Sequence, residues 1–390
     1  MFDKICIKSR EFSEGHLDMS FLIDTMLFYG EVNVLAHTAE IVKLLETFGE
    51  ETLLHLILSG RMKLHVRQNI LGIGHQPSGD KIHYGVELFH AKDISVHNTL
   101  YTAHQQLVHN STRNMQFADR FAEIAPGHVY DPIVLQMVEA DFQNPSYLTD
   151  SVSEILHTYI PEYSQPEPVR VEIEKDDRTV GPFFSSYVVH SNIDFGKINS
   201  IHAKYGKPNV SGHSSFLLTL VEARGDNYIS GQFESEFATG DLNSTLMNMQ
   251  LADVIQRTRK SEGEIIEFNK HILADCPSIG TAFVAGQITG EQLLKLLEEG
   301  DKFRKWLETI DPNADLVNRY ISEALAPALS DKAIIKTARV AATGLAGLIP
   351  GLGTVASVAD TFFVDKLING WKPNHFIDGK LKPVLHSMSH

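Results

Sequence analysis

The stretch from Val340 to Ala359 constrains the fold of this chain more than any other. It reads VAATGLAGLIPGLGTVASVA and carries no charged residue, with Lys336 and Arg339 shortly before it and Asp360 directly after it. The run is long enough to approach the thickness of a bilayer, but Pro350 and four glycines interrupt it, which excludes one continuous helix. The sequence therefore predicts a glycine-rich helical hairpin that turns at this proline.

Three interpretations of the hairpin stay open. Its arms pack as an antiparallel helix pair buried against the body, or they engage an anionic membrane surface, or they pack on a protein partner. Two arms of about 16 residues each span only about 24 Å, short of a hydrocarbon core of about 30 Å, so neither arm is expected to cross a bilayer alone. The residues predicted to contact a membrane or partner are Lys336, Arg339, Leu345, Leu348, Ile349, Phe362, Phe363, Lys366 and Trp371.

The charge of the chain is divided unevenly. The whole chain carries −15, whereas residues 331–390 hold seven Lys or Arg and four Asp, a net +3 that leaves −18 on the remainder. A body this acidic repels nucleic acid, and the sequence shows no cluster of basic and aromatic residues that would reverse this effect, so nucleic acid is not an expected partner. A basic, apolar tail on an acidic body instead favours attraction to an anionic surface.

Composition and the cysteines set the broad class. With 390 residues, 43% hydrophobic and 21% charged, the chain is typical of a globular protein of two or three domains. Cys6 and Cys276 are too few for a disulfide scaffold or a thiolate zinc site and fit a reducing compartment. The start, Met1 to Lys4, shows no signal-peptide pattern, so we expect a cytoplasmic protein that associates peripherally with a membrane if its tail engages lipid.

The local patterns predict an α+β fold that is predominantly helical with small β-hairpin elements. The spacing of apolar residues predicts helices over Phe21–Gly60 with a break at Gly49, and alternation predicts a hairpin of Met62–Ile73 with Ile82–Ala91. Helices follow over Asn98–Tyr159, broken at Pro126-Gly127 and at Asn144-Pro145.

The second part of the chain begins at a proline-rich segment. A boundary near Pro166 precedes a strand over Val169–Ile173, which we expect to pair with Phe183–His190 in a second small sheet. Helices then resume, and Thr289 with Gln292 predicts a capping box. The domains expected are a helical domain with a β-hairpin over 1–165, a small sheet with helices over 166–330, and the basic hairpin and tail over 331–390.

The last quarter of the chain carries a resemblance on loose motifs. These are Phe303-Arg304-Lys305-Trp306-Leu307, Asn313-Ala314-Asp315-Leu316, and the segments from Asp360-Thr361-Phe362 through Asp365-Lys366-Leu367 to Gly370-Trp371-Lys372-Pro373-Asn374. They resemble the C-terminal part of uncharacterised bacterial hypothetical proteins. The resemblance implies a bacterial origin and no activity.

Histidines offer the main alternative chemistry. Five of the nineteen histidines lie between residues 83 and 109. His97 and His104 are seven residues apart and share one face of the expected helix. A metal site would also need a carboxylate, and Asp93 or Asp119 could provide it only if the tertiary structure brought it near. No pair at a spacing of four residues occurs there, so hydrogen-bonded structural histidines account for the pattern better than a metal site.

Three further motifs fail on their own physical requirements. Gly212-His213-Ser214-Ser215-Phe216 resembles a nucleophile elbow but lacks the last glycine and a preceding strand. Asp311, Asn313 and Asp315 have the spacing of the first three calcium ligands of an EF-hand loop, but the later ligands of that loop are missing from the sequence. Gly351-Leu352-Gly353-Thr354-Val355-Ala356 has no strand before it. The sequence therefore predicts no cofactor and no metal.

These patterns favour a non-enzymatic binding or effector protein whose C-terminal apolar hairpin engages a membrane surface or a partner. Two alternatives remain. One is a metal-dependent enzyme that uses histidine and carboxylate groups of the N-terminal domain, and the other is a soluble scaffold that assembles as a homo-oligomer.

Overall fold

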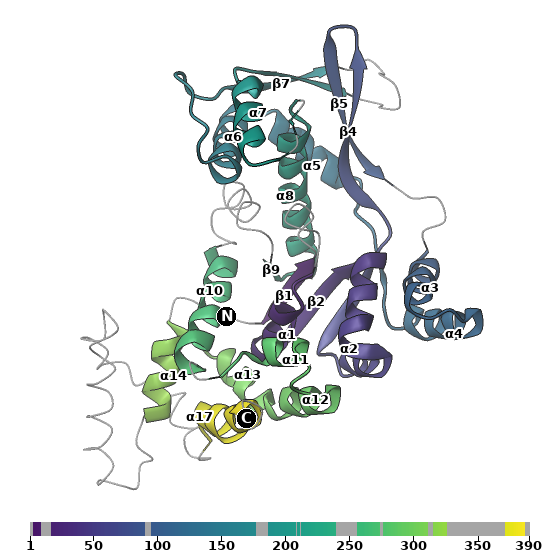
Figure 1. The fold of residues 1–390 in the computed structure, drawn as a ribbon, viewed down its shortest axis with the longest axis vertical. Coiled ribbons are helices and arrows are strands. Elements are labelled where there is room, and N and C mark those ends of the chain that lie inside the picture. The colour runs from purple at the N-terminus through teal and green to yellow at the C-terminus, as the bar shows by residue number, and fades with distance from the viewer. Residues whose placement is uncertain are drawn as a thin grey trace. The chain divides into compact units, whose positions relative to one another are not determined.

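The structure is a computed structural model. It describes residues 3–8, 17–89, 95–176, 186–207, 209–210, 212–238, 256–273, 276–310, 315–325 and 371–386. The fold is mixed α and β with two sheets (Figure 1). The chain divides into two compact units, of which unit 1 comprises Met1–Phe2, Ile23–Phe28 and Gly263–His390, and unit 2 comprises Asp3–Leu22 and Tyr29–Glu262.

A five-stranded parallel sheet forms one half of unit 2. Its strands lie in the order β6-β3-β2-β1-β9, and every pairing is parallel. Helices α1 (Met19–Phe28) and α2 (Thr38–Leu58) make the crossovers from β1 to β2 and from β2 to β3, as parallel pairing requires. The strands are β1 Lys4–Lys8, β2 Glu31–Ala36, β3 Met62–Arg67, β6 Gly127–His128 and β9 Glu236–Ala238.

This sheet corrects part of the predicted fold. The prediction of helices over Phe21–Gly60 is wrong at Glu31–Ala36, because the strand β2 lies there between α1 and α2. The run EVNVLA is too short for its apolar residues to distinguish a strand from a neighbouring helix by pattern alone. The predicted break at Gly49 is confirmed, since this residue has φ 70° and kinks α2.

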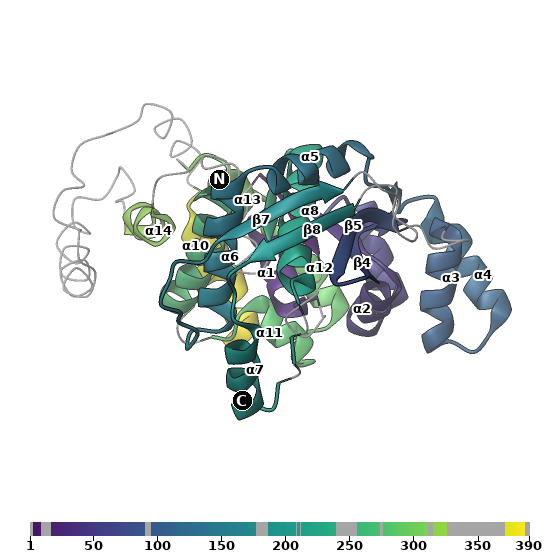
Figure 2. The same cartoon turned by 90° about the horizontal axis from the view of Figure 1, so that it is seen from above.

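The predicted hairpin is confirmed for its second strand and its turn, but the first half of its predicted first strand belongs to the other sheet. Strands β4 (Ile70–Ser78) and β5 (Lys81–Phe89) pair antiparallel, whereas Met62–Arg67 pairs with β2 as a strand of the parallel sheet. The predicted pairing of the later strands is also confirmed, because β7 (Val171–Asp176) and β8 (Ser186–Ser191) form an antiparallel ladder. All four strands make the second sheet, in the order β4-β5-β8-β7 (Figure 2).

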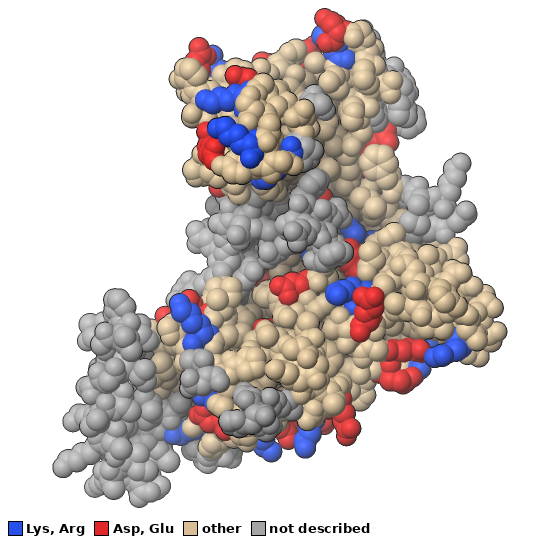
Figure 3. Space-filling model, viewed as in Figure 1, with Lys and Arg blue, Asp and Glu red and all other residues tan. Residues whose placement is uncertain are grey.

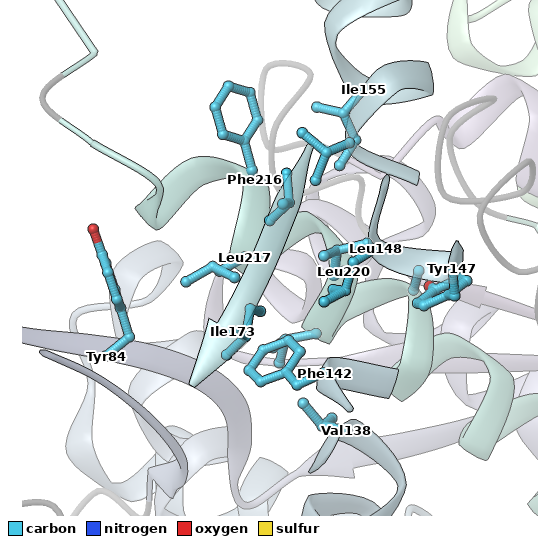
Figure 4. Close-up of a cluster of buried hydrophobic side chains, with 14 of the residues drawn as sticks. Tyr84, Val138, Phe142, Tyr147, Leu148, Ile155, Ile173, Phe216, Leu217 and Leu220 are labelled. Atoms are coloured by element: carbon cyan, nitrogen blue, oxygen red, sulfur yellow. The ribbon is translucent and has the colours of Figure 1, made fainter. Parts of the chain in front are cut away.

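Helix α8 (Ser214–Phe233) packs on β4 of the second sheet and on β1 and β9 of the first. Helices α5 (Ile133–Phe142) and α6 (Pro145–Tyr159) pack beside it, and their apolar side chains form a buried cluster with those of α8 (Figure 4). Helix α6 also packs on β7, so the boundary predicted near Pro166 falls inside unit 2. The other helices of unit 2 are α3 Val96–Leu107, α4 Ser111–Ala122 and α7 Phe195–Lys204.

Unit 1 is helical around an aromatic core. Phe28 of α1 lies 5.5 Å from Phe268 and 6.0 Å from Phe303, measured between ring centroids, and Phe303 lies 5.6 Å from Phe376. The capping box predicted at Thr289 is confirmed at the start of α12. The elements are α10 Gln256–Ile272, α11 Ile279–Val284, α12 Gly290–Glu299, α13 Asp301–Leu307, α14 Leu316–Leu325, α17 Pro373–Phe376, the π-helical η2 Ile377–Leu381 and α18 Lys382–His386.

The glycine-rich hairpin lies outside the described residues, but the helices on either side of it are described. Helix α14 ends at Leu325, α17 begins at Pro373, and the two pack against each other. Of the residues predicted to contact a membrane or partner, the structure describes only Trp371, which is half-buried. Among the helices that are described, none combines the length and the apolar character needed to cross a bilayer.

Candidate ligand-binding edge of the parallel sheet

The order of the parallel strands places a topological switch beside β1. The crossovers through α1 and α2 run from β1 outward to β2 and β3, whereas β9 joins the sheet on the other side of β1. In open sheets of this kind, ligands bind outside the carboxyl ends of the strands at such a point. The side chains at these strand ends are therefore the first place to look for a site.

A buried ion pair lies at the carboxyl end of β1. Lys8 is the last residue of this strand, and its Nζ contacts the Asp226 carboxylate of α8, with side chains 8% and 0% exposed. Removing two charges from water is costly, and packed apolar side chains would serve the fold as well. A buried pair at a switch point is consequently a candidate for function.

A second ion pair lies at the carboxyl end of β3. Arg67 is the last residue of that strand, and one of its terminal nitrogens lies 3.6 Å from Oε1 of Glu40, with both side chains less than a tenth exposed. Glu40 is in the first turn of α2, where its Oε2 accepts the backbone N–H of His37 at 2.9 Å. The carboxylate is thus fixed from two sides at the start of α2.

The two cations flank β2 at a distance that suits one ligand. In the register of the sheet, Lys8 of β1 is opposite Leu35 of β2, and Leu35 is opposite His65 of β3. Arg67 therefore lies two strands away from Lys8 and two residues further along the strand direction. The usual strand spacing and rise then separate the Cα atoms of Lys8 and Arg67 by about 12 Å. A molecule the size of a nucleotide spans such a gap.

The same face of the sheet carries a chain of polar contacts on β2 and β3. Nε2 of His65 donates to Oδ1 of Asn33 at 2.9 Å, Asn33 donates to Glu31 at 3.0 Å, and Glu31 pairs with Lys63 at 2.6 Å. Burial lowers the pKa of His65 to about 4, helped by the nearby His128, so the ring is neutral near pH 7. Faces of parallel sheets are usually apolar, which makes this chain of polar groups unusual.

His128 extends the polar face onto β6. Its Nε2 lies 2.9 Å from Oε1 of Gln232 near the end of α8, and burial lowers its pKa. The ring of Phe233 lies 4.5 Å from that of His65 and 5.8 Å from that of His128, so α8 covers both imidazoles. Asn69 exchanges two hydrogen bonds with the backbone of Tyr130 and ties together the segments that follow β3 and β6.

His97 and His104, which the alternative interpretation would make metal ligands, contact different partners. Both face α4, but His97 pairs with Asp119 at 2.9 Å, while the buried His104 bonds Asn114 at 2.7 Å and stacks on Phe117. Asp119 thus joins only one of them. The described residues contain no group of three or more histidine, cysteine or acidic side chains that could hold a metal ion.

The structure describes one of the other three motifs, the nucleophile-elbow sequence, and leaves most of the calcium-like and all of the dinucleotide-like motif outside the described residues. Ser214 begins α8, and the described residues just before it, 209–210 and 212–213, do not form the strand that a nucleophile elbow requires. The stretches at 311–314 and 351–356 lie outside the described residues.

The ion pairs of Lys8 with Asp226 and of Arg67 with Glu40 could not be predicted from the sequence, because the two partners of each pair are distant in the chain. The signals available were a lysine closing the alternating KICIK strand and an Asp-Asn step inside the helical run of α8. Both are weak without the fold. Cys6, two residues before Lys8, is fully buried, and burial together with Asp226 raises the pKa of its thiol, so it stays protonated.

Figure 3 shows red and blue side chains interspersed over the face drawn, without a broad area of one sign among the described residues. No protein-family model, no curated protein and no solved structure matches the chain.

Proposed function

We propose that the chain is a binding protein whose unit 2 takes up a polar small molecule with an anionic group at the carboxyl edge of its parallel sheet. One observation carries the proposal: buried Lys8 and Arg67 end the strands on either side of β2, and Lys8 lies next to the topological switch between β1 and β9. Each cation already has a carboxylate partner, so a ligand must exchange with Asp226 or Glu40 rather than fill a vacant charge.

Nucleotides fit this requirement. Their phosphates suit Lys and Arg, and their ribose hydroxyls can donate to carboxylates such as Asp226 and Glu40. Because the site carries two positive and two negative groups, it favours a ligand with both an anionic part and donors over a simple anion.

Thermal unfolding with added ligands tests the proposal. ATP, ADP, NAD⁺ and inorganic phosphate are compared, and a nucleotide at about 100 times its Kd should stabilise the fold by about 2.7 kcal/mol. The double variant Lys8→Met/Asp226→Leu replaces the ion pair with apolar side chains of similar size and should lose the shift. Lys63→Met, at the amino end of the same sheet face, is the matched control and should keep it. If no nucleotide raises the midpoint, or if the double variant responds like the wild type, the proposal is wrong.

We further propose that the glycine-rich hairpin engages an anionic membrane surface. Its uncharged run supports this proposal, together with the basic residues on either side of the run, which are Lys332, Lys336, Arg339 and Lys366.

Vesicle flotation tests the hairpin proposal. Residues 331–370 are replaced by a Gly-Ser linker, and 371–386 are kept because Phe376, Ile377 and Leu381 belong to the core of unit 1. The full chain should float with vesicles containing phosphatidylserine and not with phosphatidylcholine alone, and the linker variant should stay at the bottom. Equal flotation of both proteins would contradict the proposal.

A further inference from the structure

A serine and a histidine meet at the end of the second sheet, away from the carboxyl edge of the first. Ser191 is the last residue of β8, and His213 is the residue directly before α8. Oγ of Ser191 lies 2.7 Å from Nε2 of His213. Both side chains are half-buried, so they have part of their surface in water.

Packing fixes the imidazole of His213 in this position. Its ring meets Phe195 edge-on at 5.0 Å and Tyr84 edge-on at 6.3 Å, between centroids. The backbone N–H of His213 also donates to the Tyr84 hydroxyl at 3.3 Å. Gly212 permits this approach, since a Cβ there would lie 3.2 Å from that hydroxyl oxygen.

His213 is in the neutral form that a proton acceptor requires. Burial, and to a smaller extent His190, lowers the pKa of His213 to about 4, so the ring is neutral near pH 7. His190 itself lies 3.2 Å from Glu174 of β7, and burial raises the pKa of Tyr84, which stays a phenol. A neutral Nε2 can therefore accept the proton that Ser191 holds.

A second serine–histidine contact in the same sheet shows what a structural pair looks like. Nδ1 of His83 lies 3.2 Å from Oγ of Ser186, and an oxygen of Asp176 lies 3.8 Å from the same nitrogen. Serine and carboxylate thus share one ring nitrogen, whereas a catalytic triad places them on opposite nitrogens. His83 is 3% exposed and Ser186 is fully buried, which closes this pair to substrates.

We propose that Ser191 and His213 are a nucleophile and a general base that accept acyl groups from small activated esters. Oγ of Ser191 attacks the ester carbonyl carbon, and its proton passes to Nε2 of His213. The bond between that carbon and the alkoxy oxygen then breaks, and the alcohol leaves with the proton from His213. Ser191 is left acylated, and water attacks in the same way to release the carboxylic acid.

The test uses the full chain with p-nitrophenyl acetate. We expect a burst of p-nitrophenolate close to one per chain, and peptide mass spectrometry of the wild type should place the acetyl group on Ser191. Ser191→Ala should abolish the burst, and His213→Gln should slow it at least about 100-fold, the lower range for loss of a general base. Ser186→Ala, at the buried pair, should leave it unchanged.

The ionisation state of His213 sets the pH dependence expected of the acylation rate. Because His213 is already neutral, the acylation rate should be level between pH 5.5 and 8 instead of falling below an ordinary histidine pKa near 6.5. Acetyl groups found only on lysines, an unchanged burst in Ser191→Ala, or an unchanged rate in His213→Gln would overturn the proposal. The mapping on wild-type protein needs no variant to fold.

Discussion

Lys8 and Asp226 show what a single buried charge means for this fold. The carboxylate is fully buried on α8, and the ammonium at the end of β1 offsets its charge. Breaking such a pair by removing one partner is much worse for stability than replacing both with apolar groups, because the remaining charge stays in a medium that solvates it poorly.

The single variant Lys8→Met should therefore lower the free energy of unfolding by about 3–5 kcal/mol. The double variant Lys8→Met/Asp226→Leu should recover most of this loss, since no uncompensated charge remains. Urea unfolding of the two variants and the wild type measures both effects. A double variant that is no more stable than the single one would show that the pair contributes through shape rather than charge.

Acid should weaken unit 2 through its buried neutral histidines. His65 and His213 have pKa values of about 4 in the folded chain, and burial also lowers that of His128, whereas all three titrate near 6.5 when unfolded. Between about pH 6.5 and 4 the unfolded chain binds more protons, so stability falls as the pH falls through this window.

The unfolding midpoint should consequently drop between pH 7 and pH 5, measured by thermal melts at constant ionic strength. His65→Gln removes one of these titrating groups while retaining a donor toward Asn33, and it should reduce the slope. The control variant is His97→Gln, which replaces a histidine that contacts Asp119 at the surface. An equal slope in all three proteins would contradict this account.

At the scale of elements, α8 links the two sheets of unit 2, and one glycine sets how closely it packs. A Cβ on Gly225 would lie 3.1 Å from the Tyr130 hydroxyl and 3.2 Å from Cδ2 of Leu71. Gly231, in the same helix, has no such neighbour within 4 Å. Replacing each glycine with alanine therefore separates two effects on stability: crowding in the core, which occurs at Gly225, and helix propensity, which changes at both positions.

Gly225→Ala should lower the unfolding free energy by about 1–3 kcal/mol, because crowding in a packed core exceeds the gain in helix propensity. Gly231→Ala should be neutral or stabilising by up to about 1 kcal/mol. Chemical unfolding of both variants checks the difference. Equal stabilisation by both would mean that α8 packs less tightly against Tyr130 and β4 than the structure indicates.

Elements with their own local signals were predictable from the sequence. The capping box at Thr289, the kink at Gly49 and the β4–β5 hairpin all follow from residues close together in the chain. Strand β2 was missed because its short apolar run adjoins an amphipathic helix, and β6 because it is only two residues long. Parallel pairing is nonlocal, so the sheet and the ion pairs at its edge required the fold.

For the molecule as a whole, the structure changes which residues count as the basic tail. The segment 371–386 belongs to unit 1, where Lys380 pairs with Glu299 at 3.4 Å and Lys382 pairs with Asp378 at 3.0 Å. These exposed pairs contribute little stability. They do mean that attraction to an anionic surface must depend on the lysines and arginine before residue 371, which the flotation experiment isolates.

The central claim is that a ligand binds at the carboxyl edge of the parallel sheet, and photolabelling with 8-azido-ATP tests it most directly. After irradiation and digestion, mass spectrometry should place the label on peptides containing Lys8, Arg67 or His128, and excess ATP should prevent it. Label on peptides from the amino edge, such as Glu31 or Lys4, or label that ATP does not displace, would contradict the claim.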